Sequence, residues 1–473
     1  MDLSSPSRRP RVVVAGASGF IGRALLERLS TTHDVIALAR QTAGREDGPH
    51  VTWRSCDLFN LREAEDALKD AEIAVYLVHS MMPSARLTQG SFEDLDLICA
   101  DNFARAAARH GVRHMVYLGG LLPASHEGLS RHLQSRFEVE QTLGAHGVPV
   151  TTLRAGLVIG AGGSSFDMMA KLVGRLPVML APRWTRSLTQ PIALDDVLTL
   201  LVACIDRPSA TSRAYDIGCP DVVSYADMLR MTGDAQQNPI RIITLPVRTV
   251  RLSLLWVSAI TGASQSLVRP LVESLSHDMI ATDGLSLQHE IGLAPIPLRQ
   301  ALERAVRDEA ALKATRKAPA RARRPAPKVD RRACSVQRLR VSPGQRAADV
   351  AMHYLAWLPQ WMSPLLRVTV DEQRQCRFFF SPIAKPLLEL RFSPERSAPD
   401  RQLFFVTGGL LAGEAGSARP RLEFREVLGG THVLAAVHDF VPRLPWFIYK
   451  YTQALVHLLV MWAFARELTK REP

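Results

Sequence analysis

A glycine-rich turn between an apolar strand and a helix constrains the fold of this chain more than any other feature. Residues 12–15 have a strand pattern and lead directly into Gly16-Ala17-Ser18-Gly19-Phe20-Ile21-Gly22, after which apolar residues recur at helical spacing. Gly16 permits the sharp turn, Gly19 lets the backbone approach a pyrophosphate, and Gly22 allows close packing of the helix. The N–H groups at the helix N-terminus can bind phosphate. The turn therefore predicts a dinucleotide site, although a glycine turn without a ligand is the alternative. We assign to this site Gly16, Ser18, Gly19, Phe20, Ile21 and Gly22.

Further cofactor contacts are expected at the ends of the next strands. Arg40 ends the second strand, where an acidic residue would bind the ribose 2′-hydroxyl of NAD and a basic one would accept the 2′-phosphate of NADP. It therefore favours NADP(H) over NAD(H), unless it is an ordinary solvated arginine. Asp57 and Leu58 follow the third strand, where we expect them to meet the adenine. His79 and Ser80 end the fourth strand, at the sheet edge where ligands bind, and are expected to border the nicotinamide.

The first 310 residues alternate strand-like and helical patterns, as βαβ units do. The expected strands include residues 12–15, 35–39, 73–78, 115–118 and 150–153, and the expected helices include residues 24–29 and 95–110. The expected fold class is α/β, a Rossmann-type doubly wound parallel sheet over residues 1–310. Residues 311–333 are mostly Ala, Pro, Arg and Lys, with nine basic residues and one acid, and are predicted to be a solvated linker.

Residues 334–473 show a different pattern, in which strands follow one another without intervening helices. A strand at 336–341 and a helix at 345–358 come first, and a long helix at 446–468 ends the pattern. Six strands are expected between the helices, at 365–370, 377–381, 387–392, 402–407, 421–427 and 431–440. These elements predict a smaller α+β domain with an antiparallel sheet. Their order resembles the helix-grip order of START-like lipid-carrier domains, in element order only.

Residues 10–300 resemble the short-chain dehydrogenase/reductase superfamily, in its extended and atypical branch of NmrA-like and NAD(P)-binding epimerase-like proteins. The Gly-x-x-Gly-x-x-Gly spacing carries the resemblance, together with the segments at residues 154–160 and 190–197. In this branch the segment after the sixth strand builds the substrate side of the cleft. The resemblance therefore implies that Ser164, Ser165 and Phe166 could line the cleft, and flexible-loop residues are the alternative.

The chain departs from the superfamily where the chemistry is normally done. The usual Tyr-x-x-x-Lys pair is absent, and Gly119 stands near the usual serine position. His132 and Arg136 take the Tyr and Lys positions by spacing and share one helical face. A histidine can act as a general acid or base near neutral pH, whereas an arginine stays protonated and can only orient and polarise. We assign them the catalytic positions, with a solvated helix face as the alternative.

Charge, cysteines and histidines exclude several other functions. The net charge is +12, but the basic run at 311–333 supplies +8 of it, so a folded nucleic-acid-binding face is not expected. Six dispersed cysteines without a Cys-x-x-Cys pair, and no apolar leader or spanning segment, predict a cytoplasmic protein. His432, His438 and His457 are expected to bond locally rather than to hold a metal. Asp195 and Asp196 are expected to cap a helix.

Two functions fit these observations. The first is an NADP(H)-dependent oxidoreductase that acts on a carbonyl or quinone-like apolar substrate. The second is a non-catalytic NADP(H)-binding sensor or scaffold, as in NmrA-like regulators. In that case the C-terminal domain of this chain would bind an apolar ligand or contact a membrane peripherally. The aromatic residues of that domain would fill either a core or a ligand cavity, and Lys450 and the basic run favour a membrane surface. The oligomeric state is not predicted.

Overall fold

A computed structural model describes residues 8–79, 87–123, 125, 128–244, 273–275, 277–316, 332–414 and 419–470. The chain forms two compact units. The first comprises residues 1–82 and 99–322, and the second comprises residues 83–98 and 323–473.

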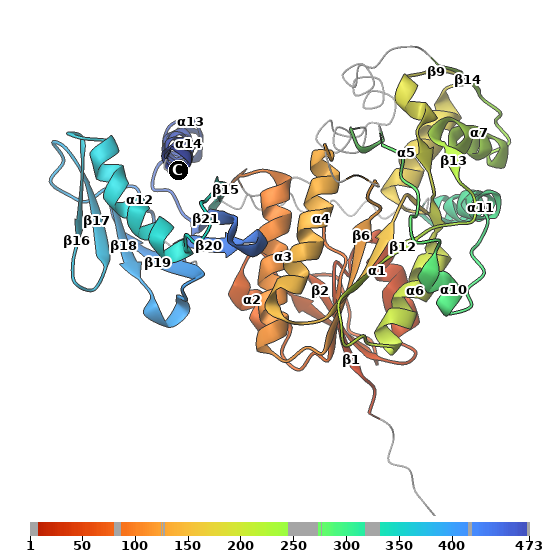
Figure 1. Ribbon diagram of the computed structural model, residues 1–473, viewed down its shortest axis with the longest axis horizontal. Coiled ribbons are helices and arrows are strands. Elements are labelled where there is room, and N and C mark those ends of the chain that lie inside the picture. Colours follow the sequence, from red (N-terminus) through yellow and green to blue (C-terminus); the bar gives the residue numbers. More distant parts are fainter. Residues whose placement is uncertain are drawn as a thin grey trace, which may run out of the picture. The chain divides into compact units, whose positions relative to one another are not determined.

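The first unit is built on a seven-stranded parallel sheet with the strand order β12-β7-β6-β4-β1-β2-β3 (Figure 1). The strands are β1 (Arg11–Ala15), β2 (Asp34–Ala39), β3 (Val51–Ser55), β4 (Ile73–Tyr76), β6 (His114–Gly120), β7 (Val150–Ala155) and β12 (Arg213–Ile217). Residues 12–15 of β1, 35–39 of β2 and 73–75 of β4 are all apolar and buried, because both faces of a parallel sheet are covered. The predicted Rossmann-type fold is confirmed.

Helices flank this sheet and bury its apolar side chains. Those nearest the sheet are α1 (Phe20–Leu29), α2 (Leu61–Ala67), α3 (Phe92–Arg109), α4 (Arg131–Leu143) and α6 (Leu194–Asp206). Leu25 and Leu29 of α1 and Leu200 and Leu201 of α6 pack with β1, β2 and β4 in one core cluster. This packing holds the C-terminal end of β1, and the glycine turn after it, in a fixed position relative to α1.

Most of the remaining elements of the first unit lie after β7 and form a separate apolar cluster, whereas Leu287 of α10 packs in the cluster of the main sheet. The described residues of this part contain three two-stranded sheets and four further α-helices. These elements are β8 (Val158–Ile159) with β11 (Ile192–Ala193), β9 (Val178–Ala181) with β14 (Arg241–Thr244), β10 (Leu188–Thr189) with β13 (Val223–Ser224), α5 (Ser164–Arg175), α7 (Tyr225–Ala235), α10 (Ser286–Glu290) and α11 (Leu298–Arg316).

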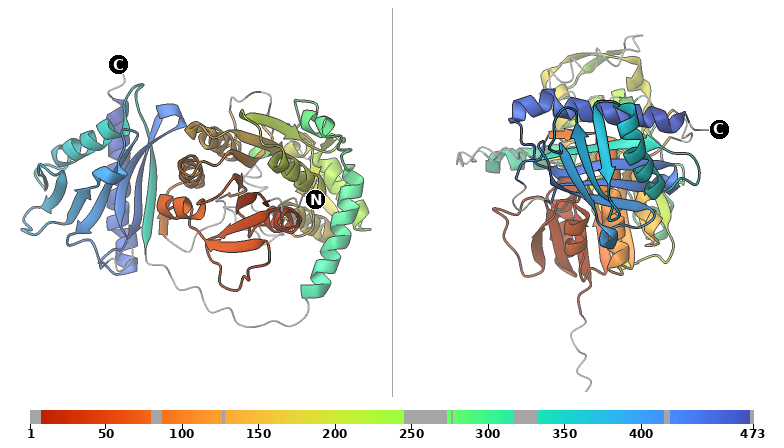
Figure 2. Two further views of the ribbon diagram at one scale, coloured as in Figure 1. Left: turned by 90° about the horizontal axis from the view of Figure 1, so that it is seen from below. Right: turned by 90° about the vertical axis from the view of Figure 1, so that its left-hand side faces the viewer.

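The second unit is an eight-stranded sheet with the order β16-β17-β18-β19-β20-β21-β15-β5. Seven of its strands are antiparallel: β15 (Ala333–Arg340), β16 (Leu366–Val370), β17 (Gln375–Phe380), β18 (Leu388–Phe392), β19 (Arg401–Gly408), β20 (Arg421–Val427) and β21 (His432–Phe440). The helices α12 (Ala347–Trp361) and α14 (Gln453–Thr469) pack their apolar residues into one cluster with the sheet (Figure 2). The predicted antiparallel sheet and C-terminal helix are confirmed.

Three details differ from the sequence-based expectations. Residues 83–98 belong to the second unit, because β5 (Leu87–Gln89) pairs in parallel with β15. The predicted linker 311–333 begins inside α11 and ends in β15, and its residues 317–331 lie outside the described residues. The predicted helix 446–468 is interrupted at Thr452, which has non-helical dihedral angles and separates α13 (Trp446–Tyr451) from α14. Within the described part of the chain, no helix is both long and apolar enough to cross a membrane.

Candidate functional site

The glycine turn after β1 has a geometry that only glycine allows. Gly16 has a φ of +85°, and a Cβ atom there would lie 2.9 Å from the carbonyl carbon and oxygen of Leu77. The Gly19 N–H donates to the Gly16 carbonyl oxygen over 2.9 Å and closes the turn. The left-handed backbone and the crowding by Leu77 both require a residue without a side chain. This turn brings the chain back across the end of β1 and into α1.

Helix α1 packs directly on this turn. A Cβ atom on Gly22 would lie 2.7 Å from the Cα atom of Ala17, so the first turn of the helix and the loop are in contact. The N-cap residue Gly19 has no side chain to bond the first N–H groups, and the first turn contains no acidic residue. The helix N-terminus is therefore suited to an anion such as a pyrophosphate.

The segment that follows β8 lies against the same helix N-terminus. Cβ atoms added to Gly160 and Gly163 would each lie 2.9 Å from the ring of Phe20. Sequence reasoning missed this contact, and the glycines at 160 and 163 were its only signal. Ser164 is exposed and Ser165 is half-buried at the start of α5, whereas Phe166 is fully buried in an apolar cluster. The expectation that Phe166 lines the cleft is wrong, because its ring lies on the inward face of α5.

Two cations lie in the connection between β2 and β3. Arg40 directly follows β2 and is exposed, and its carbonyl oxygen accepts a hydrogen bond from the Ser55 hydroxyl over 3.3 Å. Arg45, which sequence reasoning did not select, lies with its guanidinium carbon 4.3 Å from the centre of the Trp53 ring. The backbone N–H of Trp53 donates to the Asp47 carboxylate over 2.7 Å, which anchors this connection.

Asp57 and Leu58 form a turn that is held from both sides. The Asp57 N–H donates to the Glu63 carboxylate over 2.8 Å, and the Asp57 carboxylate accepts from the Phe59 N–H over 3.3 Å. The Leu58 carbonyl oxygen accepts from the buried side-chain amide of Asn102 over 2.8 Å. The position of this turn is therefore set by hydrogen bonds to α2 and α3.

Two histidines meet beyond the carboxyl ends of the central strands. His79 follows β4 and His132 lies in the first turn of α4, and their ring centres are 5.1 Å apart. Both side chains are half-buried. Ser130 caps α4 by accepting from the Leu133 N–H over 3.3 Å, and this cap sets the direction of the turn that carries His132. Ser80 lies outside the described residues.

Arg136 is held by a tyrosine that sequence reasoning did not select. A guanidinium N–H of Arg136 donates to the hydroxyl oxygen of Tyr117 over 3.2 Å, and that hydroxyl donates to the Arg136 carbonyl oxygen over 3.3 Å. Tyr117 lies on β6 and is fully buried. A Cβ atom at Gly119 would lie 3.0 Å from the Tyr117 ring, so glycine at the usual serine position makes room for this ring.

The two aspartates at the start of α6 point in different directions. Asp195 forms an ion pair with Arg28 over 2.9 Å, whereas the buried Asp196 accepts from the Ile296 N–H over 2.8 Å. Burial raises the pKa of the Asp196 carboxyl, although the Ile296 N–H opposes this shift. The expectation that they cap the helix is wrong: Ala193 is the N-cap residue, and the aspartates lie inside the first turn.

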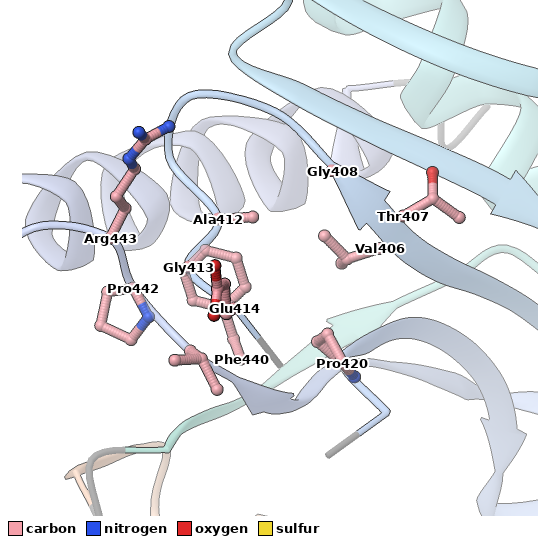
Figure 3. Close-up of a pocket in the computed structure, with 11 residues that line it drawn as sticks. Val406, Thr407, Gly408, Ala412, Gly413, Glu414, Pro420, Phe440, Pro442 and Arg443 are labelled. Carbon is pink, nitrogen blue, oxygen red and sulfur yellow. The ribbon is translucent and has the colours of Figure 1, made fainter. Parts of the chain in front are cut away.

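The second unit contains a cavity of about 640 Å³ beside the ends of β19 and β21 (Figure 3). Val406 and Phe440 contribute apolar side chains to it, and Glu414 and Arg443 contribute charged ones. Phe440 also packs in an apolar cluster with Tyr449 of α13. This volume lies within the range of small-molecule sites.

A buried ionic cluster lies on β19, β20 and β21. The Nε groups of Arg401 and Arg425 donate to one carboxylate oxygen of Glu423 over 2.6 and 2.7 Å. Burial alone would raise the pKa of Glu423, but the two guanidinium groups hold it well below its ordinary value. Burial, aided by the positive charge of Arg421, lowers the pKa of His438 to about 4.

His432, His438 and His457 each have a local hydrogen-bonding or ionic neighbour. His438 lies 3.4 Å from the Glu423 carboxylate, His457 lies 3.2 Å from the Ser335 hydroxyl, and His432 lies 2.9 Å from the Thr431 hydroxyl. Among the described residues, no group of three His, Cys, Asp or Glu side chains is arranged to hold a metal ion.

Residues 16–167, which contain the glycine turn, the Asp57 turn and both histidines of the cleft, match the family model described as NAD(P)H-binding. These residues are an NAD(P)H-binding domain. This description agrees with the nucleotide-binding part of the resemblance that the sequence shows over residues 10–300. The predicted nicotinamide cofactor is thereby confirmed, and the choice of NADP(H) stays a prediction.

Curated relatives are similar to only part of the chain. The auxiliary protein GraX of Staphylococcus aureus is 34% identical over 147 residues, which are 30% of this chain and 43% of GraX. Subunit 9 of the NADH dehydrogenase [ubiquinone] 1 alpha subcomplex, a mitochondrial protein of Arabidopsis thaliana, is 27% identical over 246 residues, 49% of this chain and 60% of that protein. Less than two thirds of either relative is therefore covered. A nucleoside-diphosphate-sugar epimerase structure from Staphylococcus aureus, 15% identical, covers 62% of this chain and 99% of its own, with a TM-score of 0.49.

Proposed function

We propose that this protein is an NADP(H)-dependent oxidoreductase that acts on a carbonyl or quinone-like apolar substrate. The observation that carries the proposal is the pair of half-buried imidazole rings of His79 and His132, 5.1 Å apart at the carboxyl edge of the sheet. In open α/β folds this edge is where ligands bind, and it lies next to the turn that is suited to the pyrophosphate. An ionisable group at the reacting end of the cleft is what carbonyl reduction requires.

The cofactor supplies a hydride to the substrate carbonyl carbon when it is bound. His132 donates the proton that the carbonyl oxygen then needs, from one of its ring nitrogens, and regains a proton from water afterwards. His79 packs against the imidazole of His132 and restricts its orientation. Arg136 cannot take part in the proton transfer, because a guanidinium does not lose its proton in proteins. Its bond to Tyr117 makes it a positioning residue for α4.

The preference for NADP(H) is proposed from the charge of the β2–β3 connection. Arg40 lies at the end of β2, where the adenine ribose of a bound dinucleotide is expected. Arg45 in the same connection lies over the Trp53 ring, an arrangement that restricts its guanidinium. Two cations on one short segment are suited to bind the 2′-phosphate of NADP(H). The two ribose hydroxyl groups of NAD(H) would not require these cations.

A non-catalytic NADP(H)-binding sensor or scaffold is the second candidate. The missing Tyr-x-x-x-Lys pair favours it. The lysine position is taken by Arg136, which is hydrogen-bonded to Tyr117 and cannot take part in a proton transfer. Two relatives of part of the chain, an auxiliary protein and a subunit of a larger complex, also favour it. In an NmrA-like role of this kind, the bound nucleotide would be sensed rather than consumed.

The second unit is proposed to hold the apolar substrate or ligand. The cavity beside Val406 and Phe440 has a suitable volume and both apolar and charged lining residues. All six cysteines are buried and free of disulfides, which fits the reducing cytoplasm that we propose as the location. Apolar carbonyl compounds and quinones partition into membranes, so a position at the membrane periphery would give access to them.

The test compares His132→Asn with the wild-type protein and with His289→Asn, a change of an exposed histidine in α10. NADPH oxidation is followed with a panel of quinones and aldehydes, and cofactor affinity is measured by calorimetric titration. We expect His132→Asn to lower turnover by roughly a hundredfold or more, with cofactor affinity changed little. Equal turnover in the two variants removes His132 as the acid. The absence of NADPH oxidation with every compound supports the sensor.

A further inference from the structure

Helix α14 is apolar on two faces, and only one of them is covered. Val460, Met461 and Phe464 are buried in the core cluster of the second unit. On the other side Leu455, Val456 and Leu459 are each 53% exposed and Trp462 is 56% exposed. A surface helix normally has polar residues on its outward side. This side of α14 therefore has the composition of a covered face.

Helix α13 extends the apolar surface. Phe447 and Tyr451 are each 68% exposed and lie four residues apart on α13, and Leu455 and Leu459 lie four residues apart on α14. Figure 2 draws α13 and α14 one after the other in dark blue at the C-terminal end of the chain. We define the outer face as the exposed apolar residues of the two helices, namely Phe447, Tyr451, Leu455, Val456, Leu459 and Trp462.

Cations border the outer face. The Lys450 ammonium lies 5.4 Å from the centre of the Tyr451 ring, and the Arg466 guanidinium lies 4.2 Å from the Trp462 ring. Residues 443–470 contain four basic residues and one acidic residue, Glu467. Among the described residues, none of the four basic side chains forms an ion pair with a carboxylate. The basic residues are Arg443, Lys450, Arg466 and Lys470.

We propose that the outer face binds the surface of a bilayer that contains anionic lipids. Aromatic and leucine side chains on one side of a helix, with cations at the border, are suited to the boundary between headgroups and acyl chains. The helices would lie in that plane, because neither crosses a membrane. A second copy of the chain is a poorer occupant: in a two-fold dimer the outer faces would meet, and with them the unpaired cations of both copies.

The test is sedimentation of the full-length protein with vesicles of phosphatidylcholine alone and with vesicles that also contain phosphatidylglycerol. One variant combines Leu455→Ser, Leu459→Ser and Trp462→Ser, and a second combines Lys450→Gln and Arg466→Gln. The matched control combines Val370→Ser and Ile383→Ser, which are 45% and 42% exposed elsewhere on the second unit. Because all these side chains are exposed, the variants should keep the wild-type thermal midpoint, which is measured alongside.

We expect the wild-type and control proteins to bind the anionic vesicles, less at high salt, and each outer-face variant to lose binding by roughly tenfold or more. Wild-type protein that does not sediment with anionic vesicles, or outer-face variants that bind as it does, would overturn the proposal. The proposal would also be overturned if light scattering showed that the wild-type protein is a dimer and the triple variant a monomer, while sedimentation showed no vesicle binding. NADPH titration of the same variants separates this surface from the proposed function, since cofactor affinity should not change.

Discussion

Replacement of Gly22 by alanine should uncouple the helix N-terminus from the cofactor without unfolding the protein. The new Cβ atom would lie 2.3 Å from the Gly16 carbonyl oxygen and 2.7 Å from the Cα atom of Ala17, whereas ordinary contact begins at 3.4 Å, so α1 must move by about 1.1 Å. The first N–H groups of the helix would then lose their alignment with the pyrophosphate. Hydrogen bonds to charged groups contribute about 1.5–3 kcal/mol each, so the loss of one should weaken NADPH binding by roughly 10- to 100-fold.

Calorimetric titration with NADPH measures this effect, and Gly174→Ala provides the matched control. A Cβ atom on Gly174, inside α5, would lie 3.8 Å from the Gln236 side chain, which is an ordinary van der Waals distance, so the same change should be tolerated there. Thermal unfolding checks that both variants fold. If Gly22→Ala binds NADPH as tightly as Gly174→Ala does, the close packing of α1 on the glycine turn is not what positions the phosphate-binding groups.

Two further variants test the second unit and the Asp57 turn. His438 has a folded-state pKa of about 4 against an ordinary 6.5, so the unfolded chain binds a proton more readily between these values and stability falls as the pH drops. We expect His438 to contribute about 2 kcal/mol to the loss of stability from pH 7 to pH 5, beside a similar contribution from His457, whose pKa burial also lowers to about 4. His438→Gln should remove its own contribution. Urea unfolding at both pH values measures it, and an equal change in the two proteins refutes it. Asn102→Ala removes a buried hydrogen bond to the Leu58 carbonyl oxygen. It should lower the free energy of unfolding by about 1–3 kcal/mol and weaken NADPH binding. An unchanged midpoint of thermal unfolding would contradict this.

Local patterns predicted most of the fold because their physical causes are local. The turn at Gly16 follows from backbone conformation alone, and a sequence records such a requirement as glycine. Strand β20 was predicted at its observed bounds, residues 421–427, because Leu422 and Phe424 alternate with Glu423 and Arg425. Leu422 and Phe424 face the apolar core, whereas Glu423 and Arg425 belong to the buried ionic cluster.

The features that were missed depend on partners far away in the sequence. Gln89 of β5 pairs with Ser335, and a three-residue strand has no pattern that could indicate such a partner. The contact of Phe20 with Gly160 and the bond between Tyr117 and Arg136 likewise join residues from separate elements. The edge of the sheet where ligands bind could be predicted from the positions at which the strands end. The pairs of side chains that meet at this edge could not be predicted.

We propose above that the first unit binds NADP(H) through the glycine turn and the cations after β2. The most direct measurement is calorimetric titration of the wild-type protein, Arg40→Glu and the control Arg207→Glu with NADPH and NADH. We expect the wild-type and control proteins to bind NADPH more tightly than NADH by roughly tenfold or more, and Arg40→Glu to lose this preference. Equal affinity for both nucleotides in the wild-type protein would contradict the NADP(H) assignment, and binding of neither would contradict the site itself.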